Sequence, residues 1–193
     1  MSDAQAKWDA VYRKIGEVAE PLSALREYTA LLPARGIALD LACGRAANAE
    51  FLARRGLTTS AWDISPVVIN QVSRRFDENA LTIDTQVRDV VAQPPAPETF
   101  DVIVVARFLE RSLAPAITDA LTPGGVLVYQ TFVSEKVNNV GPTNPDYLLA
   151  TNELLTLFAR LTARVLLDLG CCGDVEFGLR NEALLIAQKS VDV

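Results

Sequence analysis

A short apolar strand, a turn of small residues and a helix follow one another in this chain, and they limit its fold more than any other stretch. Residues 37–41 form an apolar run with one carboxylate, Asp40, near its end. A run without polar alternation is typical of a parallel strand that is covered on both faces. Small residues then lead into good helix formers at 49–55. Because such a turn brings backbone amides close to a ligand, we expect a ligand-binding cradle here.

A second carboxylate follows this unit at the spacing of a nucleotide site. Residues 57–63 read as the next strand, and Asp63 ends it. In dinucleotide-type sites, an acid about twenty residues after the turn accepts hydrogen bonds from ribose hydroxyls. The alternative is an ordinary strand–helix–strand unit that binds no nucleotide.

The remainder of the chain continues this alternation of strands and helices. Apolar runs at 81–87, 100–105 and 126–132 predict three more strands. Alternation of this kind favours a parallel sheet with right-handed crossovers. The last two strands, 164–169 and 182–188, are joined without a helix, so we expect them to pair antiparallel.

Prolines, glycines and capping residues mark the predicted helix boundaries. Pro21, Ser65 and Thr151 are placed to start helices, whereas Gly56 is placed to end one. The predicted helices cover 3–17, 22–32, 49–55, 65–76, part of 108–121 and 151–160. Residues 123–125 are expected to form a turn before the strand that follows them.

One long polar segment has no regular pattern. Residues 134–147 are rich in asparagine and contain two proline-containing turns. A loop of this length inside a compact domain is usually a lid, a binding loop or a disordered segment. We therefore expect residues 133–148 to cover a binding site.

Composition excludes several classes of function. The 193 residues suit one domain, and the formal charge of -6 disfavours a nucleic-acid partner, because phosphate binding needs a basic surface. The three cysteines lack metal-ligand spacing, so no metal site is expected. The sequence shows no signal peptide and no apolar stretch long enough to span a bilayer, so we expect a cytoplasmic protein without a membrane partner.

Several motifs along the chain resemble, in order, those of class I S-adenosylmethionine-dependent methyltransferases. Residues 40–46 correspond to the first motif, Asp/Glu-x-Gly-x-Gly-x-Gly, although alanine replaces two of its glycines. The other matching positions are Asp63, Asp89-Val90, 100–107 and the Leu-x-Pro-Gly-Gly phrase at 121–125. Residues 61–63, 108–111 and the polar loop further resemble small bacterial tellurite-resistance-type methyltransferases.

The resemblance implies a fold and an organisation. The fold is expected to be α/β and Rossmann-like, with a mostly parallel seven-stranded sheet, an antiparallel last strand and helices on both faces. It implies a single methyltransferase domain over 1–193, with N-terminal helices in 1–34 over the cofactor site. The 133–148 segment is then the lid or acceptor loop, and the protein is expected to be a monomer or homodimer.

The resemblance also implies a cofactor and the residues that bind it. S-adenosylmethionine is the expected cofactor, with S-adenosylhomocysteine as its product. Asp63 is expected to bind the ribose, Asp89 and Val90 the adenine, and Asp40 with the backbone at 42–44 the methionyl end. The full set of expected cofactor-binding residues is Trp8, Tyr12, Arg13, Asp40, Ala42, Cys43, Gly44, Asn48, Asp63, Ile64, Asp89, Val90 and Ala106.

The expected reaction is methyl transfer to a small-molecule acceptor. The chain has no histidine, the commonest general base, which favours an acceptor that is already anionic or soft, such as a thiol, a carboxylate or a chalcogen oxyanion. Arg107, just past the fourth strand, is the candidate that steers such an anion. One alternative is a non-catalytic module that binds S-adenosylmethionine or S-adenosylhomocysteine. A nicotinamide-dependent oxidoreductase is a second, which the absence of Gly-x-Gly-x-x-Gly disfavours.

Overall fold

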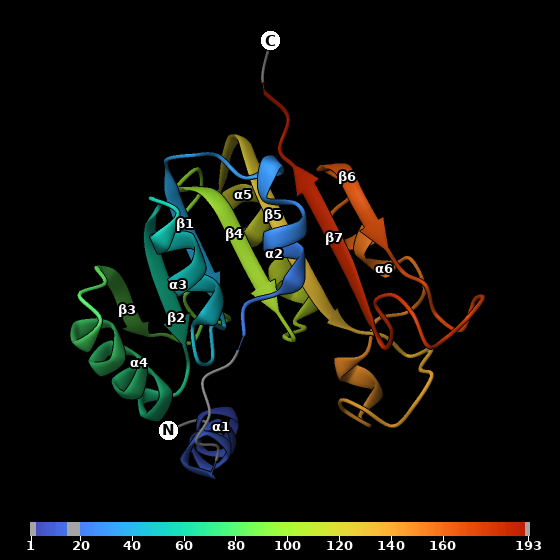
Figure 1. Cartoon of the computed structure of the whole chain (residues 1–193), viewed down its shortest axis with the longest axis horizontal. Helices are drawn as coiled ribbons and strands as arrows, with labels where there is room; N and C mark the ends of the chain where they lie inside the picture. The colour runs from blue at the N-terminus through green and yellow to red at the C-terminus, as the bar shows by residue number, and fades with distance from the viewer. Residues whose placement is uncertain (1–2, 15–19, 192–193) are drawn as a thin grey trace.

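A seven-stranded sheet runs through the computed structural model, which describes residues 3–14 and 20–191 (Figure 1). The strands are β1 (Ile37–Leu41), β2 (Thr58–Asp63), β3 (Ile83–Val87), β4 (Phe100–Ala106), β5 (Leu121–Phe132), β6 (Thr162–Leu167) and β7 (Glu182–Gln188). Their order is β3-β2-β1-β4-β5-β7-β6. The first five strands are parallel, and β7 lies antiparallel between β5 and β6. The predicted fold class is therefore confirmed, including the antiparallel pairing of the last two strands.

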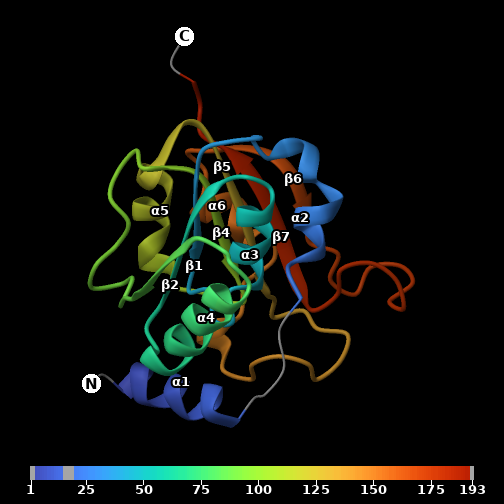
Figure 2. The same cartoon turned by 60° about the vertical axis from the view of Figure 1, so that its left-hand side comes forward.

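Helices cover both faces of the sheet (Figures 1 and 2). One face carries α2 (Ser23–Glu27), α3 (Ala47–Arg54) and α4 (Pro66–Glu78), and the other carries α5 (Ala114–Ala120) and α6 (Glu153–Leu157). The first helix, α1 (Asp3–Lys14), lies apart from both layers, below the ends of the strands and beside α4. Three 3-10 turns, η1 (Thr29–Leu31), η2 (Arg111–Leu113) and η3 (Pro145–Tyr147), complete the elements.

Burial on both faces explains why the central strands are apolar throughout. In β4, Val102 and Val104 pack into the cluster under α2 and α3, whereas Ile103 and Val105 pack into the cluster under α5. All four side chains are fully buried. Successive side chains of a strand point to opposite faces, so a strand between two helical layers needs apolar residues at every position.

Two predicted helices are interrupted by 3-10 turns, and the helix predicted at 151–160 shortens to α6, Glu153–Leu157. The helix predicted at 22–32 is α2 followed by η1, because the chain turns at Tyr28 (φ −105°, ψ 27°) and tightens. The helix predicted within 108–121 begins with η2 and becomes α-helical only at Ala114. The helix predicted over 3–17 is α-helical up to Lys14, and residues 15–17 lie outside the described residues.

The predicted start of the helix at Thr151 is wrong. The N-cap is Asn152, which has φ 61°, and asparagine tolerates this left-handed conformation better than most residues. The carboxylate of Glu153 accepts a hydrogen bond from the amide of Ala150 at 2.7 Å. The side chain of Glu153, inside the helix, therefore bonds the backbone amide of Ala150, whereas a cap by the Thr151 side chain was expected.

The predicted turn at 123–125 lies inside β5, not before it. The register between β4 and β5 shifts from Phe100–Leu121 to Val102–Val126, so the residues between form a bulge. A Cβ on Gly125 would lie 2.9 Å from the carbonyl oxygen of Thr122 and 3.0 Å from that of Phe100. Only glycine fits this close approach of backbone segments, which explains its place in the phrase.

Candidate functional site

The turn between β1 and α3 is left-handed at three alternate residues. Ala42, Gly44 and Ala46 have φ values of 54°, 51° and 55°. These are the positions where the first methyltransferase motif carries glycine. Each alanine in this conformation costs roughly 1–2 kcal/mol, because its Cβ approaches the following carbonyl oxygen. The turn is thus left-handed at all three glycine positions of the motif, although alanine replaces two of them.

The buried side chain of Asp40 bonds the start of the helix that follows this turn. Its carboxylate is fully buried and accepts hydrogen bonds from the amide of Ala49 at 3.0 Å and from the side-chain amide of Asn48 at 3.4 Å. Burial raises the pKa of Asp40 to about 7, against the opposing effect of these bonds. Asn48 in turn accepts from the amide of Leu22 at 2.9 Å. Asp40 and Asn48 therefore tie β1, α3 and the segment before α2 together.

Asp63 and Gly44 meet at the edge of the sheet, as the sequence predicts. The amide of Gly44 donates to Oδ2 of Asp63 at 2.9 Å, and the amide of Ser65 donates to Oδ1 at 2.9 Å. The backbone of Ile64 also donates to this carboxylate, and burial nevertheless raises the pKa of Asp63. The second acid thus lies directly beside the turn, on the end of the neighbouring strand.

Tyr12 fills the space next to these two residues. Its hydroxyl hydrogen-bonds Asp63 and lies 3.0 Å from the point that a Cβ on Gly44 would occupy. Burial and the nearby Asp63 carboxylate raise the pKa of Tyr12 well above its usual value. The phenol therefore occupies the space beside the Asp63 carboxylate, where the resemblance led us to expect a ribose hydroxyl.

Further contacts dock α1 against the ends of the strands. The hydroxyl of Ser65 donates to the buried carboxylate of Asp9, and Trp8 stacks on Tyr12 with ring centroids 5.8 Å apart. Lys7 lies over the ring of Tyr147, 4.9 Å from its centroid. Arg13, also expected at the cofactor site, is exposed.

The Asp89 region forms the neighbouring strand end. Oδ1 of Asp89 accepts from the amides of Val91 and Ala92 at 3.0 and 3.3 Å, which leaves Oδ2 without a hydrogen bond to the described residues. The side chain of Val90 is buried in the core. The amide of Arg88 donates to the carbonyl oxygen of Asp63 at 2.8 Å, so the ends of β2 and β3 are joined.

Cys43 and Ala106 complete the predicted cofactor set. Cys43 is buried, its amide donates to the carbonyl oxygen of Trp62 at 2.9 Å, and burial raises the pKa of its thiol. It therefore stays protonated and packs under the turn. Ala106 ends β4 and leads directly to Arg107.

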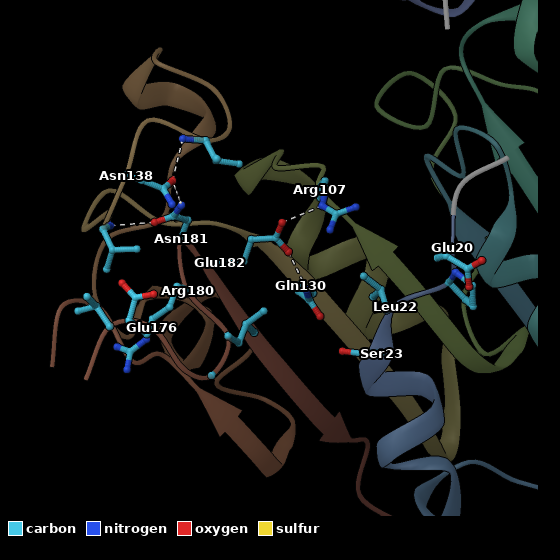
Figure 3. A pocket seen from close by; sticks show the side chains of 16 residues that line it. Glu20, Leu22, Ser23, Arg107, Gln130, Asn138, Glu176, Arg180, Asn181 and Glu182 are labelled. Atoms are coloured by element: carbon cyan, nitrogen blue, oxygen red, sulfur yellow. Dashed lines mark hydrogen bonds and ion pairs between the residues drawn. The ribbon is translucent and has the colours of Figure 1, made fainter. Parts of the chain in front are cut away.

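Arg107 lines a separate cavity of about 970 Å3 at the ends of β4 and β5 and the start of β7 (Figure 3). The segment before α2, the polar loop and the connection between β6 and β7 form its other walls. Its labelled lining residues are Glu20, Leu22, Ser23, Arg107, Gln130, Asn138, Glu176, Arg180, Asn181 and Glu182. Arg107 is the only residue of the predicted site that lies in this cavity.

Sequence reasoning missed Glu182 and Gln130. Arg107 Nε donates to Glu182 Oε1 at 2.7 Å, and Gln130 Nε2 donates to Glu182 Oε2 at 2.6 Å. Glu182 is 8% exposed, although it opens a strand that is otherwise apolar up to Gln188. That single acid at the start of an apolar strand was the available signal. Its partners depend on how β7 pairs with β5.

Comparison with known sequences places the best-matched part of the chain at the turn and the strands that follow it. Residues 38–125 match the methyltransferase domain family. The ubiquinone biosynthesis O-methyltransferase of Xylella fastidiosa (strain 9a5c) is 36% identical over 101 residues, which cover 48% of this chain and 40% of that protein. The chain thus spans less than half the length of this curated relative.

Solved structures with the same fold extend over nearly the whole chain. TehB from Haemophilus influenzae gives a TM-score of 0.70 at 20% identity, covering 95% of this chain and 67% of that chain. Geranyl diphosphate C-methyltransferase from Streptomyces coelicolor A3(2), in complex with Mg2+, geranyl diphosphate and S-adenosyl-L-homocysteine, gives 0.74 at 13% identity, covering 97% and 98%. At these identities the likeness concerns the fold.

The sequence and structural findings agree with one another. The left-handed turn and the Asp63 carboxylate beside it lie within the matched segment. Among the described residues, no helix is long and apolar enough to cross a membrane. Residues 38–125, just under half of the chain, are therefore similar to the methyltransferase domain family, as the motifs predicted, and the described chain has the fold of the solved structures.

Proposed function

We propose that this protein transfers the methyl group of S-adenosylmethionine to a small-molecule acceptor. One observation carries the proposal. The Asp63 carboxylate, at the end of β2, lies 2.9 Å from the amide of Gly44, which belongs to a turn that is left-handed at residues 42, 44 and 46. A buried carboxylate beside a left-handed turn of small residues suits a ligand with vicinal hydroxyls and a polar chain.

The residues around this point fit the cofactor. Gly44 is the one glycine that remains in the motif. A Cβ at this position would lie 3.0 Å from the Tyr12 hydroxyl, which fills the space beside Asp63. Asp63 would accept from the ribose hydroxyls once Tyr12 has moved aside. The open Oδ2 of Asp89 would accept from the adenine amino group. Asp40 and Asn48 would act by holding the turn, since both are turned towards α3 and α2.

The acceptor would bind in the cavity beside Arg107. The bound sulfonium supplies an activated methyl group, so the task of the protein is to hold the acceptor atom in line with it and to exclude water. The absence of histidine favours an anionic or soft acceptor, such as a thiol, a carboxylate or a chalcogen oxyanion. The exposed guanidinium of Arg107 provides the positive charge for such a group.

Transfer to oxygen is the second candidate, because the matched relatives are named as ubiquinone biosynthesis O-methyltransferases. The match to the family covers 38–125, whereas most residues that line the cavity lie outside this range. The acceptor therefore has to be identified from the cavity and by experiment. The cytoplasmic location, the single domain and the monomeric or homodimeric state remain predictions.

The cofactor part of the proposal is tested with Asp63→Ala. We expect the affinity for S-adenosylhomocysteine, measured by isothermal titration calorimetry, to fall by roughly 2–4 kcal/mol, because the ribose hydroxyls lose a charged partner. Asp84→Ala is the matched control, since it removes a carboxylate from β3 that contacts only Ser60 and Gln86. An unchanged dissociation constant in Asp63→Ala would remove Asp63 from the site.

The catalytic part needs a separate measurement. A cell extract incubated with the protein and methyl-labelled S-adenosylmethionine should yield one or a few labelled small molecules, which mass spectrometry identifies. Binding of S-adenosylhomocysteine without any labelled product would favour the non-catalytic binding module over the enzyme.

A further inference from the structure

Arg107 holds a strained backbone conformation at the end of β4. Its φ is 53°, a left-handed value that strains the backbone of a non-glycine residue. The surrounding structure fixes it there, because its amide donates to the carbonyl oxygen of Gln130 at 2.7 Å. Backbone strain of this kind persists only where neighbouring contacts over-determine it, and it concentrates at functional sites.

Glu182 fixes the side chain of the same residue. One oxygen of its carboxylate accepts a hydrogen bond from Arg107 Nε at 2.7 Å, and the other accepts one from Gln130 Nε2 at 2.6 Å (Figure 3). The Glu182 side chain is 9% exposed, whereas that of Arg107 is 56% exposed. The Nε–H of the Arg107 guanidinium is therefore already bonded to Glu182. Its two terminal nitrogens donate to no other residue of the described chain.

The other charged groups of the cavity are engaged elsewhere or lie at its rim. Arg180 donates to carbonyl oxygens of the β6–β7 connection, including those of Gly170, Cys172 and Asp174. Glu20 pairs with Arg26 at 2.9 Å. Among the described lining residues, Arg107 is thus the one cation whose two terminal nitrogens both lack a hydrogen bond to another described residue, and Glu182 is the only buried carboxylate.

We propose that Arg107, clamped by Glu182 and Gln130, is an anion subsite of the acceptor cavity that selects acceptors carrying a single negative charge. The terminal nitrogens of Arg107 bind one carboxylate or thiolate of the acceptor. The negative charge of Glu182 already balances that of Arg107, so a second anionic group on the acceptor is repelled. This inference rests on the proposed function, because it names the acceptor class for the same site.

The test uses three thiols of increasing charge: 2-mercaptoethanol, 3-mercaptopropionate and mercaptosuccinate. Each is titrated by ligand-observed NMR into the protein, with and without saturating S-adenosylhomocysteine. We expect 3-mercaptopropionate to bind about fivefold more tightly than 2-mercaptoethanol, and mercaptosuccinate to bind no more tightly than 3-mercaptopropionate, since partly exposed charge pairs differ by about 1 kcal/mol.

Three variants separate the contributions of the residues. Arg107→Gln should abolish the preference for 3-mercaptopropionate over 2-mercaptoethanol. Glu182→Gln keeps the shape and one acceptor oxygen but removes the charge, so mercaptosuccinate should gain about fivefold relative to 3-mercaptopropionate. Glu176→Gln removes the same charge from the same cavity without contacting Arg107, so it should change this ratio much less. Thermal melts confirm that each variant is folded.

The outcomes distinguish this proposal from the proposed function. Tighter binding of mercaptosuccinate by the unmodified protein, or an equal effect of Glu176→Gln and Glu182→Gln, would overturn the anion subsite. So would the absence of thiol binding to a protein that binds S-adenosylhomocysteine. Failure to bind S-adenosylhomocysteine would instead refute the proposed cofactor, while the titrations without it still report on the subsite.

Discussion

Ala42 and Ala46 hold a conformation that alanine rarely adopts. Both have φ near 55° in the turn after β1, where the methyltransferase motif has glycine. Their environments differ, because Ala42 is half-buried whereas the methyl group of Ala46 is fully buried among Ala49, Ala61 and Val68. The two positions therefore carry similar strain but different compensation from packing.

This difference predicts the effect of restoring each glycine. Ala42→Gly should raise the free energy of unfolding by about 1 kcal/mol, because relief of the left-handed strain exceeds the entropy that glycine adds to the unfolded chain. Ala46→Gly should be close to neutral, because it also loses a buried methyl group worth about 0.8 kcal/mol. Urea unfolding of both variants checks this, and a destabilised Ala42→Gly would contradict it.

Asp40 should make stability depend on pH. Burial raises its pKa from the usual 3.8 to about 7, so the folded state binds a proton more tightly than the unfolded state. Stability from this group is therefore lost as pH rises from about 4 to about 7. Asp63, whose pKa is also raised, acts in the same direction.

Asp40→Asn tests this titration. Urea unfolding of the variant between pH 4 and 7 should show a flatter loss of stability than the unmodified protein, by at most about 1.4 kcal/mol per pH unit. The asparagine oxygen can still accept from the amide of Ala49. Parallel pH curves for the two proteins would show that Asp40 does not titrate in this range.

At the scale of elements, α1 occupies the space beside Asp63 in which we propose that the cofactor binds. The Tyr12 hydroxyl hydrogen-bonds Asp63, and the Asp9–Ser65 contact holds the helix in place. Tyr12→Phe removes the competing hydrogen bond, so S-adenosylhomocysteine should bind roughly 2–10-fold more tightly. Weaker binding would mean that the hydroxyl contacts the bound cofactor. Tyr28→Phe, at the end of α2, is the control and should leave the affinity unchanged.

The polar loop is anchored at both ends, and part of its middle lines the cavity beside Arg107. Arg111 donates to the carbonyl oxygens of Asp146 and Leu148, and the amide of Val137 donates to the side chain of Asn181. Its centre includes Asn138 and Val140, which line the acceptor cavity. The predicted lid role fits this placement and remains a prediction.

Shortening the loop separates the two binding events. Deletion of 138–144 should abolish methyl transfer, because the cavity loses one wall and admits water. It should leave S-adenosylhomocysteine affinity unchanged, because the Gly44–Asp63 pair lies on other elements. Calorimetry and a labelled-methyl assay on the same preparation check both statements. A loss of cofactor affinity would show that the loop also supports the cofactor.

At the scale of the whole molecule, contacts could be predicted from the sequence where they follow from the alternation of strands and helices. Gly44 follows β1 and Asp63 ends β2, and adjacent parallel strands end at the same edge of the sheet. The Glu182–Gln130 pair has a different origin. In the register of β5 and β7, Gln130 faces Leu184 and Phe132 faces Glu182, so the two polar side chains are diagonal neighbours on one face. Such a pairing depends on a long-range antiparallel register that local patterns do not specify.

The insertion of β7 between β5 and β6 separates the two proposed binding sites along the chain. The strand ends of the proposed cofactor site lie between residues 40 and 90, whereas the cavity proposed for the acceptor takes much of its wall from the connection that leads into β7. Exchange of that C-terminal hairpin should therefore change much of the wall of the proposed acceptor cavity. Grafting the hairpin of a related protein should retune which molecule is methylated and leave the donor site untouched.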